Sequence, residues 1–212
     1  MSKSLLITRP RYDLITSYFY VWSESIINFA KNKMIPVYDL RETKATKNNF
    51  ESYISARKPS LIFVNAHGNP QEILGQDGEV IIDKKSSKID SIIYARSCDA
   101  AQILGSILIQ NGIKTFIGYT RKFILGYKPN CISAPLTDNL AKLFLEPSNS
   151  IATILLKGHS AQVAHNRSRA QMYKYFRKMI SSTATYEERY AARWLWSNFK
   201  SQVLIGSNEQ KI

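Results

Sequence analysis

Two short stretches decide the fold: residues 61–68, Leu-Ile-Phe-Val-Asn-Ala-His-Gly, and residues 91–99, Ser-Ile-Ile-Tyr-Ala-Arg-Ser-Cys-Asp. Each begins as an apolar run rich in β-branched and aromatic residues, which predicts a strand buried on both faces. Each run ends in a side chain that can carry chemistry, His67 in the first and Cys98 in the second. Because functional side chains of an open α/β sheet gather at the carboxyl ends of its strands, the two should meet if these strands are neighbours, about 4.8 Å apart.

The rest of the chain supplies the alternating elements that a parallel sheet requires. One helix is predicted to run from Asp13, a suitable N-cap, to about Lys33. Further strands are expected at residues 4–8, 35–40, 114–119 and 202–205, and further helices at residues 47–57, 136–145, 150–157, 160–180 and 186–195. The pattern predicts an α/β fold, a mainly parallel sheet of about six strands with helices on both faces.

Length and composition limit the class of protein. The 212 residues contain no Pro- or Gly-rich linker, so residues 1–212 are predicted to form a single domain. No apolar run approaches the roughly 20 residues that cross a bilayer, and the apolar start is too short for a secretory signal. Two cysteines do not make a disulfide framework. We therefore expect a cytoplasmic protein that does not engage a membrane.

The positive charge is concentrated towards the end of the chain. Of the net charge of +13, residues 151–200 contribute nine Lys or Arg against two Asp or Glu, whereas residues 61–150 are nearly balanced. A basic helical face attracts acidic proteins or nucleic acid, so weak polyanion binding is one expectation. The alternative is a solvated face that aids solubility.

Cys98 and His67 are the candidate catalytic residues. A helix is predicted to begin at Asp99, and a helix N-terminus lowers the pKa of a preceding thiol, which must ionise before it can attack. His67 would serve as the base, and the backbone N–H groups of Gly68 and Cys98 would form an oxyanion hole. The alternatives are a buried structural cysteine and a loop histidine. No metal-binding pattern and no phosphate-binding glycine loop are present, so no metal and no cofactor are expected.

Several blocks of the chain together resemble the CHAT domain, a branch of the caspase-like cysteine peptidases with the caspase-hemoglobinase fold. The blocks are the His-Gly and Ser-Cys-Asp strand ends, then residues 111–118, the aromatic segment 194–199 and the strand 203–206. CHAT members usually carry Thr-Gly where Ala100 and Ala101 stand here.

The resemblance implies a three-layer sandwich and a cysteine endopeptidase that uses the His67–Cys98 dyad on specific protein substrates, in a regulatory role. It also implies that an activating protein partner can exist. The alternative is a catalytically silent caspase-like binding module that docks an acidic protein or nucleic acid through its basic helices.

Arg96 and Asp99 are the candidate substrate-binding residues. Side chains alternate along a strand, so Arg96 shares a face with Cys98. In related caspase-like peptidases this position often lines the pocket for the residue before the scissile bond, and an arginine there would prefer an acidic side chain. Asp99 could instead select a basic side chain or cap the helix. Arg96 could also pair with Asp99 or Asp77 and never meet substrate.

Overall fold

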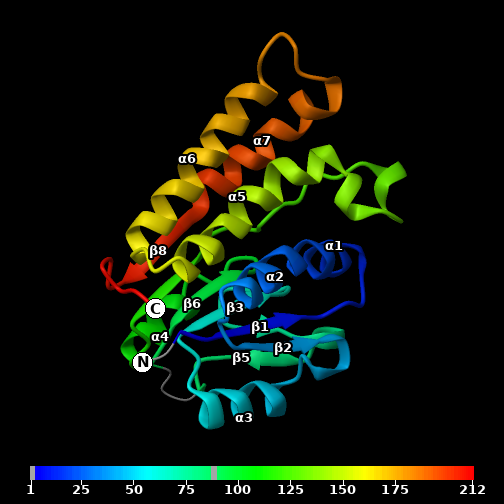
Figure 1. Ribbon diagram of the computed structural model, residues 1–212. Helices are drawn as coiled ribbons and strands as arrows, with labels where there is room; N and C mark the ends of the chain where they lie inside the picture. Colours follow the sequence, from blue (N-terminus) through cyan, green and yellow to red (C-terminus); the bar gives the residue numbers. More distant parts are fainter. Residues whose placement is uncertain (1–2, 87–89) are drawn as a thin grey trace.

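The two stretches at residues 61–68 and 91–99 form neighbouring strands in the middle of a six-stranded sheet, β3 and β6 (Figure 1). The computed structural model describes residues 3–86 and 90–212. The sheet has the order β2-β1-β3-β6-β7-β8, in which only β8 runs antiparallel to its neighbour. Its strands are β1 (Leu5–Arg9), β2 (Val37–Arg41), β3 (Leu61–Asn65), β6 (Ile92–Arg96), β7 (Thr115–Tyr119) and β8 (Gln202–Gly206).

Helices cover both faces of this sheet, as the sequence predicts. The helices are α1 (Leu14–Trp22), α2 (Glu24–Asn32), α3 (Lys47–Arg57), α4 (Leu104–Gln110), α5 (Asn139–Leu156), α6 (Ala161–Met179) and α7 (Tyr186–Ser201). Short 3₁₀ turns lie at Glu42–Lys44, Gln76–Gly78, Pro129–Cys131 and Pro135–Thr137. Helices α1, α2, α5, α6 and α7 pack on one face, and α3, α4 and the hairpin of β4 (Ile73–Leu74) and β5 (Val80–Ile82) pack on the other.

Strand side chains alternate between these two cores. Phe63 of β3 and Tyr94 of β6 stack in the first core, with ring centroids 4.8 Å apart. Their neighbours Val64 and Ala95 point into the second core. Because every residue of β1, β3, β6 and β7 is buried, these strands are nearly continuous apolar runs rather than half-polar ones. No helix within residues 3–86 and 90–212 has the length and apolar character needed to span a bilayer.

Two helix predictions differ from the structure. The helix expected from Asp13 to Lys33 is two helices that meet at buried Ser23, whose hydroxyl donates to the Phe19 carbonyl and accepts a hydrogen bond from Arg96 at 3.2 Å. The helices expected on either side of residues 146–149 are one continuous helix, α5, that runs through Pro147. Most of α5 is buried, and Ser168 donates a hydrogen bond to the Pro147 carbonyl at 2.8 Å, so tertiary packing outweighs the proline.

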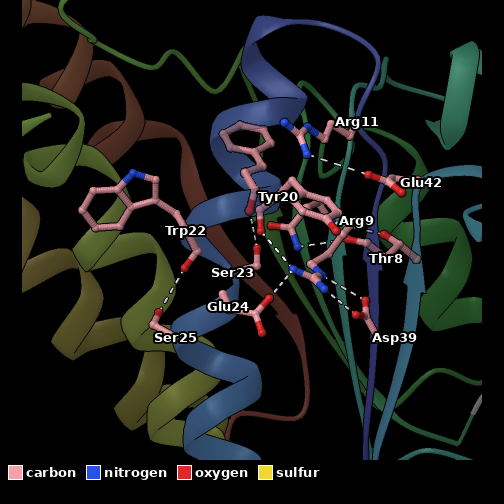
Figure 2. A network of polar contacts seen from close by, with 12 residues as sticks. Thr8, Arg9, Arg11, Tyr20, Trp22, Ser23, Glu24, Ser25, Asp39 and Glu42 are labelled. Carbon is pink, nitrogen blue, oxygen red and sulfur yellow. Dashed lines mark hydrogen bonds and ion pairs between the residues drawn. The ribbon is translucent and has the colours of Figure 1, made fainter. Parts of the chain in front are cut away.

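Arg9 at the end of β1 anchors the first two helices to the sheet (Figure 2). Its guanidinium is 3% exposed and pairs with Glu24 of α2 at 2.7 Å and with Asp39 of β2, whose carboxylate accepts a second bond from Nε at 2.9 Å. It also donates to the Tyr20 carbonyl at 3.1 Å and lies 4.4 Å from the centre of the Tyr20 ring. This buried cation is thus balanced by two carboxylates, as buried charges usually are.

Candidate active site

His67 and Cys98 line one pocket of about 200 Å³ at the carboxyl edge of the sheet. The register of β3 and β6 pairs Asn65 with Arg96. His67 and Cys98 each lie two positions beyond these paired residues, so they leave the sheet at neighbouring points. The other lining residues come from α1, from the two strand ends and from the segment after β7: Ile15, Phe19, Ala66, Arg96, Ser97, Lys122, Phe123, Ile124 and Leu125. The structure therefore brings the two candidate catalytic side chains together.

Asp13 orients the imidazole of His67. One carboxylate oxygen of Asp13 lies 2.5 Å from Nε2 of His67, while the other accepts the backbone N–H of Thr16 at 2.8 Å. Burial alone would raise the pKa of Asp13, but the hydrogen bonds from Thr16 and His67 outweigh it and lower that pKa below its ordinary value. Because Nε2 is engaged with Asp13, Nδ1 is the ring nitrogen that has no hydrogen-bond partner among the described residues.

The setting of Cys98 differs from the one predicted. Helix α4 begins at Leu104 rather than at Asp99, and residues 99–103 form turns, so no helix N-terminus follows the thiol. Burial raises the pKa of Cys98, and the Asp99 charge adds to this, against the lowering effects of the Phe123 carbonyl and Lys122. The thiol lies 3.9 Å from the Phe123 carbonyl oxygen and donates to it. The resting thiol is therefore protonated and held by the segment 122–125.

Gly68 occupies a position that only glycine can fill. A Cβ there would lie 2.1 Å from the hydroxyl of Ser97 and 2.9 Å from the carbonyl oxygen of Glu72. Among the described residues, neither the Gly68 N–H nor the Cys98 N–H has a hydrogen-bond acceptor. Both N–H groups are therefore free to donate, which is the first requirement of an oxyanion hole, although Gly68 itself does not line the pocket.

Arg96 lies beneath the pocket and is fully buried. Its guanidinium sits between the rings of Phe19 and Phe63, 4.5 and 5.1 Å from their centres. It donates to Asn149 at 2.8 Å and also to the Asn65 side chain. Its Nε has no partner, and no carboxylate pairs with it among the residues that the structure describes.

The hydrogen bonds of the Arg96 guanidinium all go to neutral side chains. The expected alternative, a pairing of Arg96 with Asp99 or Asp77, is therefore not found. Burial lowers the pKa of Arg96 to about 10, which leaves the group charged at neutral pH. Asp99 is not among the residues that line the pocket, and its backbone is left-handed with φ of 58°. It does not cap α4, whose N-cap position is Ile103.

The contact of Asp13 with His67 is the functional feature that sequence reasoning missed, whereas the segment 122–125 was indicated only as part of a long loop at residues 120–135. The predicted N-cap role of Asp13 is confirmed by its capping box with Thr16, but its second oxygen serves His67, 54 positions away. No sequence pattern signals that contact. The segment 122–125 falls within a long Gly- and Pro-containing loop, a feature typical of functional or mobile loops.

Comparison with known proteins supports the fold. No known protein-family model matches the chain, and no curated protein matches it by sequence. Among solved structures, the complex of pro- and mature domains of RgpB from Porphyromonas gingivalis matches with a TM-score of 0.61 and 11% identity over 99% of this chain and 48% of that one. The Arg-specific cysteine proteinase gingipain R matches with a TM-score of 0.64 and 11% identity over 99% of this chain and 47% of that one.

A third solved structure, titled only as a protease, gives a TM-score of 0.57 at 11% identity over 99% of this chain and 48% of that one. The chain spans about half the length of each of these proteins. Together with the strand order, these matches confirm the predicted caspase-like fold; at this identity they show the fold alone.

The raised pKa of Cys98 predicts slow labelling in the folded protein. Iodoacetamide should modify Cys98 slowly at pH 7, with a rate that rises about tenfold per pH unit until the thiol pKa is passed, because only the thiolate reacts. Peptide mapping by mass spectrometry would give this rate for the folded and the urea-unfolded chain. Labelling of folded Cys98 at pH 7 that matches or exceeds the unfolded rate would contradict the buried, protonated thiol.

Proposed function

We propose that the protein is a cysteine endopeptidase of the CHAT branch that cleaves specific protein substrates in the cytoplasm. The observation that carries the proposal is the pocket at the carboxyl edge of the sheet that is lined by both His67 and Cys98. The fold shared with cysteine proteinases such as gingipain R supports it. Both cysteines are free, as suits a reducing compartment.

The proposed reaction follows from the position of each group. The Cys98 sulfur attacks the carbonyl carbon of the scissile bond, while the carbonyl oxygen becomes an anion held by the N–H groups of Gly68 and Cys98. The C–N bond breaks, and His67 delivers the proton from the thiol to the leaving amine. Water then hydrolyses the thioester with His67 as base, which restores the thiol. Asp13 keeps the imidazole in one tautomer and one orientation.

The resting site is best described as latent. Its thiol bonds to the Phe123 carbonyl, and His67 bonds to Asp13. We propose that substrate or an activating protein partner displaces the segment 122–125, frees the sulfur and lets its pKa fall. A catalytically silent binding module is the second candidate, since the raised pKa of Cys98 would suit an inert buried thiol equally well.

We further propose that the pocket prefers an acidic residue before the scissile bond. Arg9 and Arg96 are both buried guanidinium groups in the sheet. Arg9 faces two carboxylates (Figure 2), whereas Arg96 faces none among the described residues. An uncompensated positive charge under a pocket of low dielectric attracts an anion and repels Lys or Arg, even without direct contact. Lys122 at the pocket adds to this effect. Asp99 lies outside the lining, so the preference is assigned to Arg96.

Cys98→Ala and His67→Ala should each abolish cleavage of a natural substrate protein. Both side chains are partly exposed, so circular dichroism and the melting temperature should stay close to those of the wild type. Cys131→Ala is the matched control and should keep full activity, because Cys131 lies outside the pocket. Cleavage by the Cys98→Ala protein at the wild-type rate would exclude the proposed mechanism.

Asp13→Asn should separate orientation of His67 from capping of α1. Asparagine is as good an N-cap as aspartate, so the melting temperature should change little. The rate of cleavage should nevertheless fall by roughly 10²-fold or more, because the amide can present its N–H group to Nε2 and favour the other tautomer of His67. Thr46→Asn, the same kind of exchange at the N-cap of α3, provides the control. An unchanged rate in Asp13→Asn would leave Asp13 with a capping role only.

The pocket preference can be read from the second-order labelling rates of peptidyl ketone probes that carry Asp, Asn, Leu or Arg next to the reactive carbonyl. The Asp probe should label Cys98 roughly 10- to 100-fold faster than the Arg probe, the size expected of a charge-assisted contact. Arg96→Met should erase the difference, whereas Arg9→Met, which removes a buried guanidinium outside the pocket, should retain it. Faster labelling by the Arg probe in the wild type would contradict the assignment to Arg96.

A further inference from the structure

The helical hairpin of α6 and α7 carries a cluster of aromatic rings that the catalytic pocket does not use. Tyr173 and Phe176 of α6 meet Trp196 and Phe199 of α7, and we call these four residues the aromatic platform. The ring centroids of Phe176 and Trp196 lie 4.9 Å apart, and those of Trp196 and Phe199 lie 5.1 Å apart. Tyr173 is 46% exposed and Trp196 is 37% exposed. In Figure 1 the two helices run side by side and extend beyond the sheet.

Two cations lie against rings of the aromatic platform. The guanidinium carbon of Arg169 lies 4.1 Å from the centre of the Phe199 ring, and the ammonium of Lys200 lies 5.9 Å from that of Trp196. Helix α6 contains no acidic residue, and its basic residues are Arg167, Arg169, Lys174, Arg177 and Lys178. The two acidic residues of α7 lie in its first turn, where Glu188 caps the backbone N–H of Thr185 at 2.9 Å.

These cations have no anionic partner within the chain. Among the described residues, no ion pair involves a Lys or Arg of α6 or α7, although ion pairs form elsewhere, for example Lys47 with Asp83 at 3.0 Å. A surface that served only solubility would require the charges, but large exposed aromatic rings beside them would not increase solubility. The combination therefore calls for a ligand that is both anionic and rich in flat apolar surface.

We propose that this face of α6 and α7 binds single-stranded nucleic acid. Unpaired bases stack on exposed aromatic rings whatever their sequence, and the phosphates between them pair with flanking Lys and Arg side chains. The bases would stack on Tyr173 and Trp196, and the basic residues of both helices would bind the phosphates of the nucleic acid. A duplex would satisfy the cations but keeps its base faces stacked inside. This binding goes beyond the proposed peptidase activity and does not depend on it.

The test uses the full chain and fluorescence anisotropy with a labelled 20-nucleotide oligothymidine and a 20-base-pair duplex, at 50 and 200 mM salt. The single strand should bind more tightly than the duplex, with affinity that falls steeply as salt rises. Tyr173→Ala and Trp196→Ala should each weaken binding of the single strand by roughly 5- to 100-fold and leave the duplex nearly unaffected. Tyr186→Ala is the matched control, since Tyr186 is a 73% exposed ring on the same helix outside the platform.

The cations are tested separately from the rings. Lys174→Gln should weaken binding of the single strand and should reduce the slope of log affinity against log salt concentration by about 0.7. Lys33→Gln, at the C-terminal end of α2, should change neither the affinity nor the slope. Circular dichroism verifies that each variant folds. Equal affinity for single strand and duplex, unchanged by Tyr173→Ala and Trp196→Ala, would mean that the surface binds polyanions through charge alone and would overturn the proposal. So would the absence of binding at 50 mM salt, or ring-dependent binding of an acidic polypeptide but not of the oligonucleotide.

Discussion

The parallel pairing of β3 with β6 is the constraint on which the site depends. The register joins Leu61 to Ile92 and Asn65 to Arg96, and a shift by one residue would turn each side chain to the opposite core. The pairing is fixed by burial on both faces, including the stacked rings of Phe63 and Tyr94. It brings His67 and Cys98, each two residues beyond the end of its strand, to the same pocket.

In the proposed peptidase, the environment of the pocket would keep the resting thiol protonated. Burial disfavours the thiolate of Cys98, and the Phe123 carbonyl accepts a hydrogen bond from the thiol. The proposed catalytic residues follow two central strands, whereas the proposed control comes from a segment after β7. Such a division would suit an enzyme that acts on few substrates, because only a partner or substrate that displaces Phe123 would free the thiol.

The sequence predicts those features that follow from local patterns. Continuous apolar runs at residues 61–66 and 91–97 indicate the central strands, and Asp13 is a confirmed N-cap. Features set by distant contacts could not be predicted. Ser23, at the junction of α1 and α2, accepts a hydrogen bond from Arg96, 73 positions away, and the continuity of α5 depends on packing around Pro147.

The environment of Cys98 was predicted wrongly for a similar reason. A polar residue after a strand and before an apolar run suggests a helix start, but the turns at residues 99–103 are held by the neighbouring segment. The Asp99 N–H donates to the Arg121 carbonyl at 3.2 Å, and the Ala101 N–H donates to the Tyr119 carbonyl at 3.0 Å. These contacts delay α4 until Leu104 and leave burial, not a helix terminus, to govern the pKa of the thiol.

The most direct test of the account is a crystal structure of the protein after reaction with a peptidyl ketone. The account predicts a covalent bond to the Cys98 sulfur, the adduct oxygen within hydrogen-bond distance of the Gly68 and Cys98 N–H groups, and Phe123 moved away from the sulfur. An adduct whose oxygen meets neither donor, or a Cys98 that stays bonded to Phe123 while the probe sits elsewhere, would contradict the claim that the β3 and β6 strand ends form a catalytic site.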